Sequence, residues 1–303
     1  AKRDGLVGGR VFGGGARPCI DLGGQAPVYA ICRGMTAVLW MLAMFYPDST
    51  YDQPSFDAGR IFLHDWKFSG VITNPGDSRT LLARMGLQCR SLIAPDAQGR
   101  YYWTVWDSGQ VPKMTFDATN IVEQGNTLLR SSVPIDSLYS SVYVYWGTKV
   151  GGSTSPTDYP GVAYCTPTAT SAGGGGAALM AMCLAAQMLY GIEHRLDFFA
   201  DFVHDEATAT LLLAWLVGRV AQRREVYTWR AWLDAVPRRI GDVVSLTHPV
   251  VPYGATILLD LIGWHFDPGS MTVELVGRSL PPTPPAVGGE FVFNHGSVYL
   301  QNV

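Results

Sequence analysis

The chain has 303 residues, of which 48% are hydrophobic and 16% are charged. The charged share lies below the roughly 25% of an average soluble domain, and this composition excludes an intrinsically disordered chain. With 22 basic and 25 acidic residues the net charge is −3, so the chain lacks the positive field that nonspecific nucleic-acid binding requires. A mean hydropathy of +0.12, together with 9 Trp, 14 Tyr and 12 Phe, predicts that part of the apolar surface is buried against other subunits.

The N-terminal third is predicted to contain an irregular arm and two helices. Residues 1–27 hold several glycine clusters and two prolines, which indicates an irregular arm or a short strand pair rather than a packed unit. Residues 28–46 carry apolar side chains at helical spacing and predict a buried helix. A second helix is predicted over residues 78–93, with Cys89 on its apolar face.

The middle of the chain is predicted to mix strands, a linker and an apolar helix. Residues 101–106 and 141–146 are rich in aromatic and β-branched residues and predict strands. Residues 147–176 are rich in Gly, Ser, Thr and Pro, which indicates a linker or surface excursion. A very apolar helix is predicted over 177–190, followed by a short connection over 197–203.

The last third is predicted to be one helix followed by β structure. The helix spans 206–224 and ends in arginines, which suit a helix C-terminus. The strands are expected at residues 227–233, 243–247, 256–262 and 271–276, with a short terminal strand at 291–293. In the strand 243–247, Val244 and Leu246 are expected on one face toward the core, with Val243 and Ser245 on the other, which meets either solvent or a neighbour.

These elements predict an α+β fold with β-barrel-like lobes, a mixed helix and strand domain and an inserted apolar helical segment. The predicted units are an arm at 1–27, an α+β domain at 28–146, an insertion with the apolar helix at 147–203, a helix plus β-barrel-like domain at 204–280 and a Pro-rich extension at 281–303.

No motif in the sequence predicts catalysis, a metal site or a cofactor site. The five cysteines are widely spaced and form no CxxC pair, which disfavours a zinc site or a disulfide framework. His204, Asp205 and Glu206 are consecutive, so their side chains cannot converge on one ion if they are helical, and a capping turn is expected instead. Asp48, Asp52 and Asp57 are interpreted as solvated turn acids.

The order of several segments nevertheless resembles the central hub or tail-tip proteins of tailed bacteriophages. The segment 51–57 is similar to the family's "ID..SF" stretch, and 81–103 is similar to its helix followed by a strand. Residues 114–121 resemble "TFT.DNI", and 138–145 resemble "YN.V.V.Y". Residues 240–249 look like "PGDVVTLTHP", and residues 271–275 resemble the family's later "G.V.L.L" strand.

The resemblance implies a structural protein of the virion, located at the distal tail tip or baseplate. It implies a homotrimer with two barrel-like hub lobes per chain, which would close the tail tube and bind tube proteins and fibre or receptor-binding proteins. Neither a cofactor nor sequence-specific nucleic acid is expected. The structural or interface candidates on the matching segments are Asp52, Phe56, Phe116, Asn120, Tyr139, Tyr145, Gly241, Asp242, Leu246 and His248.

Two other classes of function stay open at this point. One is a tail-associated hydrolase that acts on cell-wall glycan or peptide, for which a convergent carboxylate pair or Cys/His pair would be needed. The other is a module that contacts the host membrane through residues 177–192, although this run is shorter than the roughly 20 residues that cross a bilayer.

Overall fold

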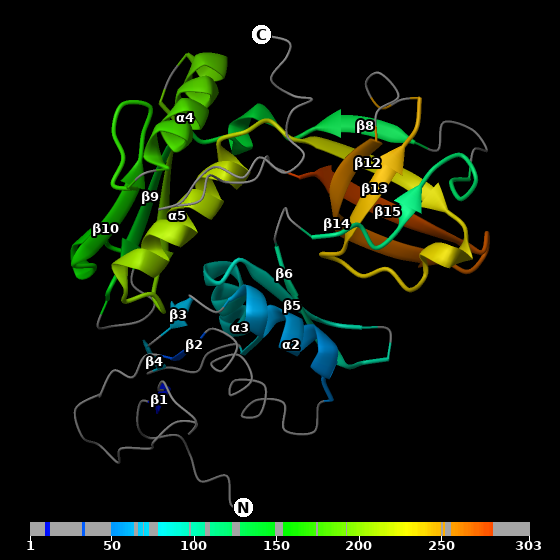
Figure 1. Cartoon of the computed structure of the whole chain (residues 1–303), viewed down its shortest axis with the longest axis horizontal. Coiled ribbons are helices and arrows are strands. Elements are labelled where there is room, and N and C mark those ends of the chain that lie inside the picture. Colours follow the sequence, from blue (N-terminus) through cyan, green and yellow to red (C-terminus); the bar gives the residue numbers. More distant parts are fainter. Residues whose placement is uncertain are drawn as a thin grey trace, which may run out of the picture.

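The chain folds around two hydrophobic cores, which define two lobes (Figure 1). A computed structural model describes residues 10–12, 32–33, 50–63, 66–68, 70–72, 78–96, 98–106, 110–122, 128–148, 154–173, 175–191, 193–249, 251 and 256–280. The core of the α/β lobe draws on residues between Phe56 and Ala221. The core of the β lobe draws on residues between Phe116 and Leu275, so the chain passes from one lobe to the other more than once.

Two helices pack on a hairpin in the first part of the α/β lobe. The hairpin pairs β5 (Ser91–Pro95) with β6 (Tyr101–Val105), and α2 (Gln53–Phe62) and α3 (Ser78–Gln88) contact it. Helix α2 begins with a proline in its first turn, where a missing N–H costs no hydrogen bond. Two short strand pairs lie nearby, β1 (Arg10–Phe12) with β4 (Gly70–Ile72) and β2 (Cys32–Arg33) with β3 (Lys67–Phe68).

The second part of the α/β lobe is a three-stranded sheet with two helices on one face. Its strand order is β10 (Gly161–Cys165), β9 (Ser141–Trp146) and β11 (Arg195–Ala200). Strand β9 is antiparallel to β10 and parallel to β11. Helices α4 (Gly176–Tyr190) and α5 (Glu206–Val220) contact each other and the sheet, as Figure 1 shows at the upper left.

The β lobe is a strongly curved six-stranded sheet, visible at the upper right of Figure 1. Its order is β7 (Thr115–Phe116), β13 (Val243–Thr247), β14 (Thr256–Asp267), β15 (Thr272–Ser279), β12 (Glu225–Ala231) and β8 (Leu129–Ser132). Beyond β7 the chain reaches the far side of the sheet, where Ile121 bridges Ala231. The helices and the separate sheets confirm the α+β class. The described strands do not close a barrel, and the barrel stays a prediction.

Side chains alternate across the β lobe as the period of a strand requires. Val244 and Leu246 are fully buried in the core of the β lobe, which confirms the predicted shared face. Val243 and Ser245 lie on the opposite face but are also buried, at 1% and 5% exposure. Of the two alternatives for this face, solvent is therefore excluded. Val243 pairs directly with Asp260 on β14, and Asp260 bonds Arg219 of α5, so this face lies toward the α/β lobe.

The helix predicted at residues 78–93 ends earlier than expected. Helix α3 stops at Gln88, and Leu92 and Ile93 belong to strand β5 instead. Arg90 has a left-handed backbone (φ 45°), which ends the helix and turns the chain into the strand. Of the helix predicted over 28–46, residues 32–33 form strand β2 and the rest lies outside the described residues.

Two segments interpreted as connections are strands. The predicted linker 147–176 contains β10, and the predicted connection 197–203 overlaps β11. Both strands pair with β9, which supplies the hydrogen-bond partners that their own composition does not reveal. The arm over 1–27, apart from β1, and the terminal strand at 291–293 fall outside the described residues.

The remaining elements agree with their predictions within a few residues. The apolar helix is α4, the arginine-ended helix is α5, and the strand at 243–247 has the predicted bounds. That the apolar helix is an insertion, and that the units divide at the predicted boundaries, stay predictions. Within the described part of the chain, the helices are too short or too polar to qualify as membrane spans.

Candidate functional site

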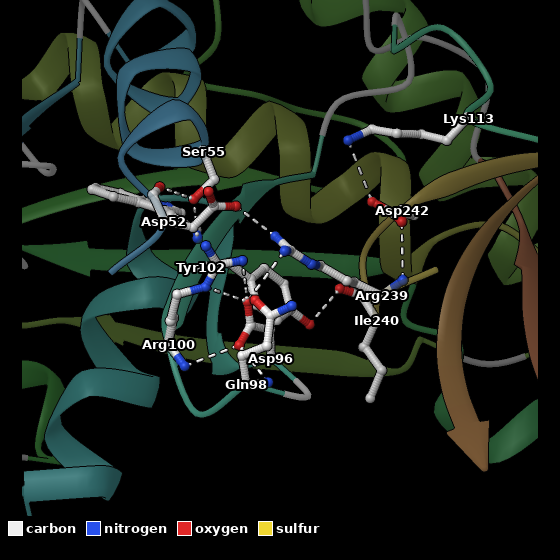
Figure 2. Close-up of polar contacts among 11 residues, drawn as sticks. Asp52, Ser55, Asp96, Gln98, Arg100, Tyr102, Lys113, Arg239, Ile240 and Asp242 are labelled. Atoms are coloured by element: carbon white, nitrogen blue, oxygen red, sulfur yellow. Dashed lines mark hydrogen bonds and ion pairs between the residues drawn. The ribbon is translucent and has the colours of Figure 1, made fainter. Parts of the chain in front are cut away.

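The loop before strand β13 carries an arginine whose backbone is held by a local pair of hydrogen bonds. The N–H of Arg239 donates to Oδ2 of Asp242 at 2.9 Å, and the N–H of Asp242 donates to the carbonyl of Arg239 at 3.0 Å. These reciprocal bonds close a tight turn and aim the Arg239 side chain away from the β lobe, toward α2 and the β5–β6 hairpin (Figure 2).

The guanidinium of Arg239 bonds to two carboxylates of the α/β lobe. Nη1 donates to Oδ2 of Asp52 at 2.6 Å, and Nη2 donates to Oδ2 of Asp96 at 3.2 Å. The same group lies over the ring of Tyr102, 5.0 Å from its centroid. Asp52 precedes α2, Asp96 follows β5, and Tyr102 lies on β6, so one side chain ties three elements of one lobe to the other (Figure 2).

Asp96 is held ionised by partners of its own lobe. Its Oδ1 accepts the N–H groups of Gln98 and Arg100 at 2.9 Å each, and its Oδ2 accepts Nε and Nη2 of Arg100 at 3.1 and 3.0 Å. Burial opposes the charge, but these hydrogen bonds outweigh it, so the pKa of Asp96 lies below its usual value. Asp96 is thus an anchored negative charge for Arg239.

Tyr102 and Lys113 complete the contact. The hydroxyl of Tyr102 donates to the carbonyl of Ile240 at 3.0 Å. Burial and the charge of Asp242 raise the pKa of Tyr102 to about 12, so the hydroxyl keeps its proton and stays a donor. Nζ of Lys113 lies 3.5 Å from Oδ1 of Asp242. We name this cluster the junction network; it contains three cations and three carboxylates, namely Arg100, Lys113, Arg239, Asp52, Asp96 and Asp242.

Gly241 lets the two lobes approach closely beside this network. Its φ of +90° is in the left-handed region, which favours glycine. A Cβ at this position would lie 2.8 Å from Cγ2 of Thr104 on strand β6. Gly241 is therefore required both by the turn and by the contact between the lobes.

The structure brings together only three of the predicted site residues. Asp52, Gly241 and Asp242 meet at the junction network, although Asp52 is a bonded ion and not the solvated turn acid that was predicted. Phe56, Phe116 and Leu246 are fully buried in the two cores, where they pack. Their role as interface residues stays a prediction.

The other four candidates lie at separate places. Asn120 closes a turn by accepting the N–H of Asp117 and donating to the carbonyl of Thr115. The remaining three lie on other elements: Tyr139 stacks on His194, Tyr145 accepts Nη2 of Arg195, and His248 follows β13. None of these contacts reaches the junction network.

Three residues of the network were missed from the sequence, namely Asp96, Arg100 and Lys113, as was Tyr102 beside it. Arg239 lies directly before the segment 240–249, but nothing in the sequence marks it as a partner of Asp52 and Asp96, which are 187 and 143 residues away.

The remaining chemical expectations concern capping and cysteines. The side chain of Asp205 accepts the N–H of Thr208 at 3.1 Å, which confirms the predicted cap of α5. Cys89 and Cys183 are fully buried as predicted, and burial raises the pKa of Cys89 to about 12. In the described ranges, no three His, Cys, Asp or Glu side chains gather as metal ligands would.

The fold is similar to that of a virion protein. Compared with a chain from the virion of a native gene transfer agent particle, the TM-score is 0.57 at 10% sequence identity, over 88% of this chain and 51% of that chain. The present chain thus spans about half the length of that protein, and the similarity shows a shared fold.

Two further comparisons are with tail proteins. The tail protein from Neisseria meningitidis MC58 gives a TM-score of 0.42 at 12% identity, over 81% of this chain and 66% of that chain. The 43 kDa tail protein of prophage MuSo2 from Shewanella oneidensis gives 0.38 at 14% identity, over 68% and 56%. No family model and no curated protein matches the sequence.

Proposed function

We propose that this chain is a structural protein of a bacteriophage-type tail, with the role of a hub at the distal tip or baseplate. The observation that carries the proposal is the fold shared over 88% of the chain with a protein of a gene transfer agent virion. The ordered segments that resemble the hub family, from residue 51 to residue 275, support the same assignment independently of the fold comparison.

The geometry of the junction network suits a role in holding the two lobes rigidly together. Its charges balance, since Arg239 pairs with both Asp52 and Asp96, Arg100 also pairs with Asp96, and Lys113 lies beside Asp242. The charged groups of such a network bond to one another, and together they hold the two lobes in one relative orientation. A tail component that binds neighbouring proteins through both lobes requires that rigidity.

The proposal includes a homotrimer that contacts tube proteins on one side and fibre or receptor-binding proteins on the other. Exposed apolar side chains on α4 support an assembled state, because Leu184, Met188 and Leu189 are 42%, 76% and 58% exposed on a helix without charged residues. We further propose that the role is structural and includes no catalytic step.

Localisation in purified particles tests this function. Antibody fragments raised against the chain and imaged by negative-stain electron microscopy should decorate the distal end of the tail. Fragments first adsorbed with the purified chain are the control and should leave the tails bare. Decoration of the head, or of the whole tube length, would contradict a tip position, and unlabelled intact particles that lack the chain by mass spectrometry would contradict a virion role.

Mass photometry of the purified chain tests the assembly state. We expect a species of three times the chain mass of 32.9 kDa. Met188→Lys should shift this species toward the monomer without changing the melting temperature, because it places a charge on an exposed apolar face. An unchanged monomer in the wild-type protein would argue against the homotrimer.

A further inference from the structure

A second polar contact between the lobes differs from the junction network because its charges do not balance. It lies where the C-terminal end of α5 meets the outer face of the β lobe. Asp260 on β14 is 1% exposed, and its Oδ2 accepts Nη2 of Arg219 at 2.7 Å and lies 3.5 Å from Nη2 of Arg224. Arg278 is the residue directly opposite Asp260 on β15. We name these four residues the arginine cluster.

The arginine cluster places three positive charges, two of them buried, around one negative charge. The side chains of Arg219 and Arg224 are 10% and 3% exposed, and Arg278 is half-buried. Removing charged groups from water is costly unless an opposite charge compensates them. Burial, with the neighbouring arginines, lowers the pKa of Arg224 to about 9. A single carboxylate leaves two of the three cations uncompensated.

Several donors in this cluster have no hydrogen-bond partner among the described residues. They are Nε of Arg219, Nη1 of Arg224 and Nε of Arg278, and Oδ1 of Asp260 also lacks a partner. Arg219 is partly compensated, because its guanidinium lies 4.8 Å and 5.3 Å from the ring centroids of Trp106 and Trp215. The buried donor of Arg224 and that of Arg278 are thus the groups with most to gain from a ligand.

We propose that the arginine cluster binds one small oxyanion, a carboxylate or a phosphate group, through Arg224 and Arg278. Guanidinium groups present planar pairs of N–H donors that match the oxygens of both anions. The partial exposure of Arg278 provides the side from which the anion enters. The bound anion would balance the excess charge and strengthen the contact between α5 and the β lobe. This inference is independent of the proposed tail function.

Thermal melting of the full chain at constant ionic strength tests the site. Sodium chloride is compared with millimolar sodium phosphate and, separately, with millimolar sodium acetate, which distinguishes a phosphate from a carboxylate ligand. We expect a saturable rise of about 2–4 °C in the melting temperature with at least one of the two oxyanions. A rise with phosphate alone, or with acetate alone, assigns the ligand class.

The variant Arg278→Gln should abolish the rise, whereas the control Arg230→Gln should keep it. Arg230 lies on β12 of the same sheet, is 52% exposed and pairs with Glu274, so it tests for nonspecific anion effects. In chloride, Arg278→Gln should melt no lower than the wild-type protein, because it removes one of three like charges. If this variant fails to fold, Arg278→Lys keeps the charge without the planar fork and should weaken the response several-fold.

Two results would overturn the proposal. One is a melting temperature that is the same in phosphate, acetate and chloride. The other is a rise of equal size in the wild-type protein and in the Arg278 variant, which would show an adventitious effect of the anions on the whole surface.

Discussion

At the scale of single residues, the contact between the lobes depends on one glycine and on the charges beside it. Gly241 combines a left-handed backbone with a close approach to Thr104, so two separate costs meet any side chain placed there. Asp96 combines burial with five hydrogen bonds, one of them from Arg239, so its ionisation is coupled to folding. Both features can be tested without disturbing a core.

Gly241→Ala should destabilise the protein by about 1–3 kcal/mol, because the backbone is strained and the new Cβ meets Thr104. Thr104→Ser removes the methyl group that the Cβ would strike. The loss caused by Gly241→Ala should therefore be smaller in the Thr104→Ser background, as measured by urea unfolding of the four proteins of this cycle. An equal loss in both backgrounds would show that only the backbone conformation matters.

The contribution of Asp96 to the free energy of unfolding should depend on pH. Its pKa is below the usual 3.8 in the folded protein, so below about that pH the unfolded chain binds more protons than the folded chain. The stability contributed by Asp96 is therefore complete above this region and is lost as pH falls through the folded pKa. The difference in unfolding free energy between the wild-type protein and Asp96→Asn should shrink as pH falls.

The control for this titration is Asp136→Asn at an exposed position of the helix Ile135–Ser137. It should differ little from the wild-type protein at any pH. A difference for Asp96→Asn that stays constant between neutral and acid pH would contradict the role of its charge.

At the scale of the elements, strand β13 shows that alternation decides faces but not exposure. Val244 and Leu246 face the core of the β lobe, and Val243 is buried on the opposite side. Leu246→Ala should cost about 2–5 kcal/mol in unfolding free energy, and Val243→Ala about 1–3 kcal/mol. Chemical denaturation measures both, and a negligible cost for Val243→Ala would show that this face is open to solvent.

Strand β10 can be tested through a glycine that its pairing requires. A Cβ on Gly161 would overlap the indole of Trp146 on β9. Gly161→Ala should therefore destabilise the sheet by about 1–3 kcal/mol, since the indole must move. The control is Gly173→Ala, which has nothing within 4 Å and should be nearly neutral. Equal melting of the two variants would argue against the β9–β10 pairing.

At the scale of the whole molecule, the two cores are coupled through Arg239. Arg239→Gln removes both ion pairs across the junction and should cost about 1–3 kcal/mol, because hydrogen bonds to charged groups are the stronger ones. Calorimetry should also show the single unfolding transition broaden or split, as the lobes lose their contact. The control Arg230→Gln removes an exposed ion pair within the β lobe and should change stability by less than about 0.5 kcal/mol.

A broadened transition in both variants would show that any lost charge has this effect. An unchanged transition in Arg239→Gln would show that apolar contacts alone couple the lobes.

Much of the local structure could be predicted from the sequence. The cap of α5 by Asp205, the bounds of β13 and the burial of Cys89 and Cys183 follow from patterns within a few residues. They could be predicted because capping and alternation depend on neighbours in the chain. The α+β class followed from the same signals.

The tertiary structure decided the strands β10 and β11, the junction network and the arginine cluster. Residues 161–165 read as a linker because their composition is poor in large apolar groups, and only pairing with β9 makes them a strand. Arg239 meets Asp52 and Asp96 across 187 and 143 residues, and Arg219 meets Asp260 across 41. Charges so far apart in sequence carry no mutual signal in a single chain, because only the packing of the two lobes places them within bonding distance.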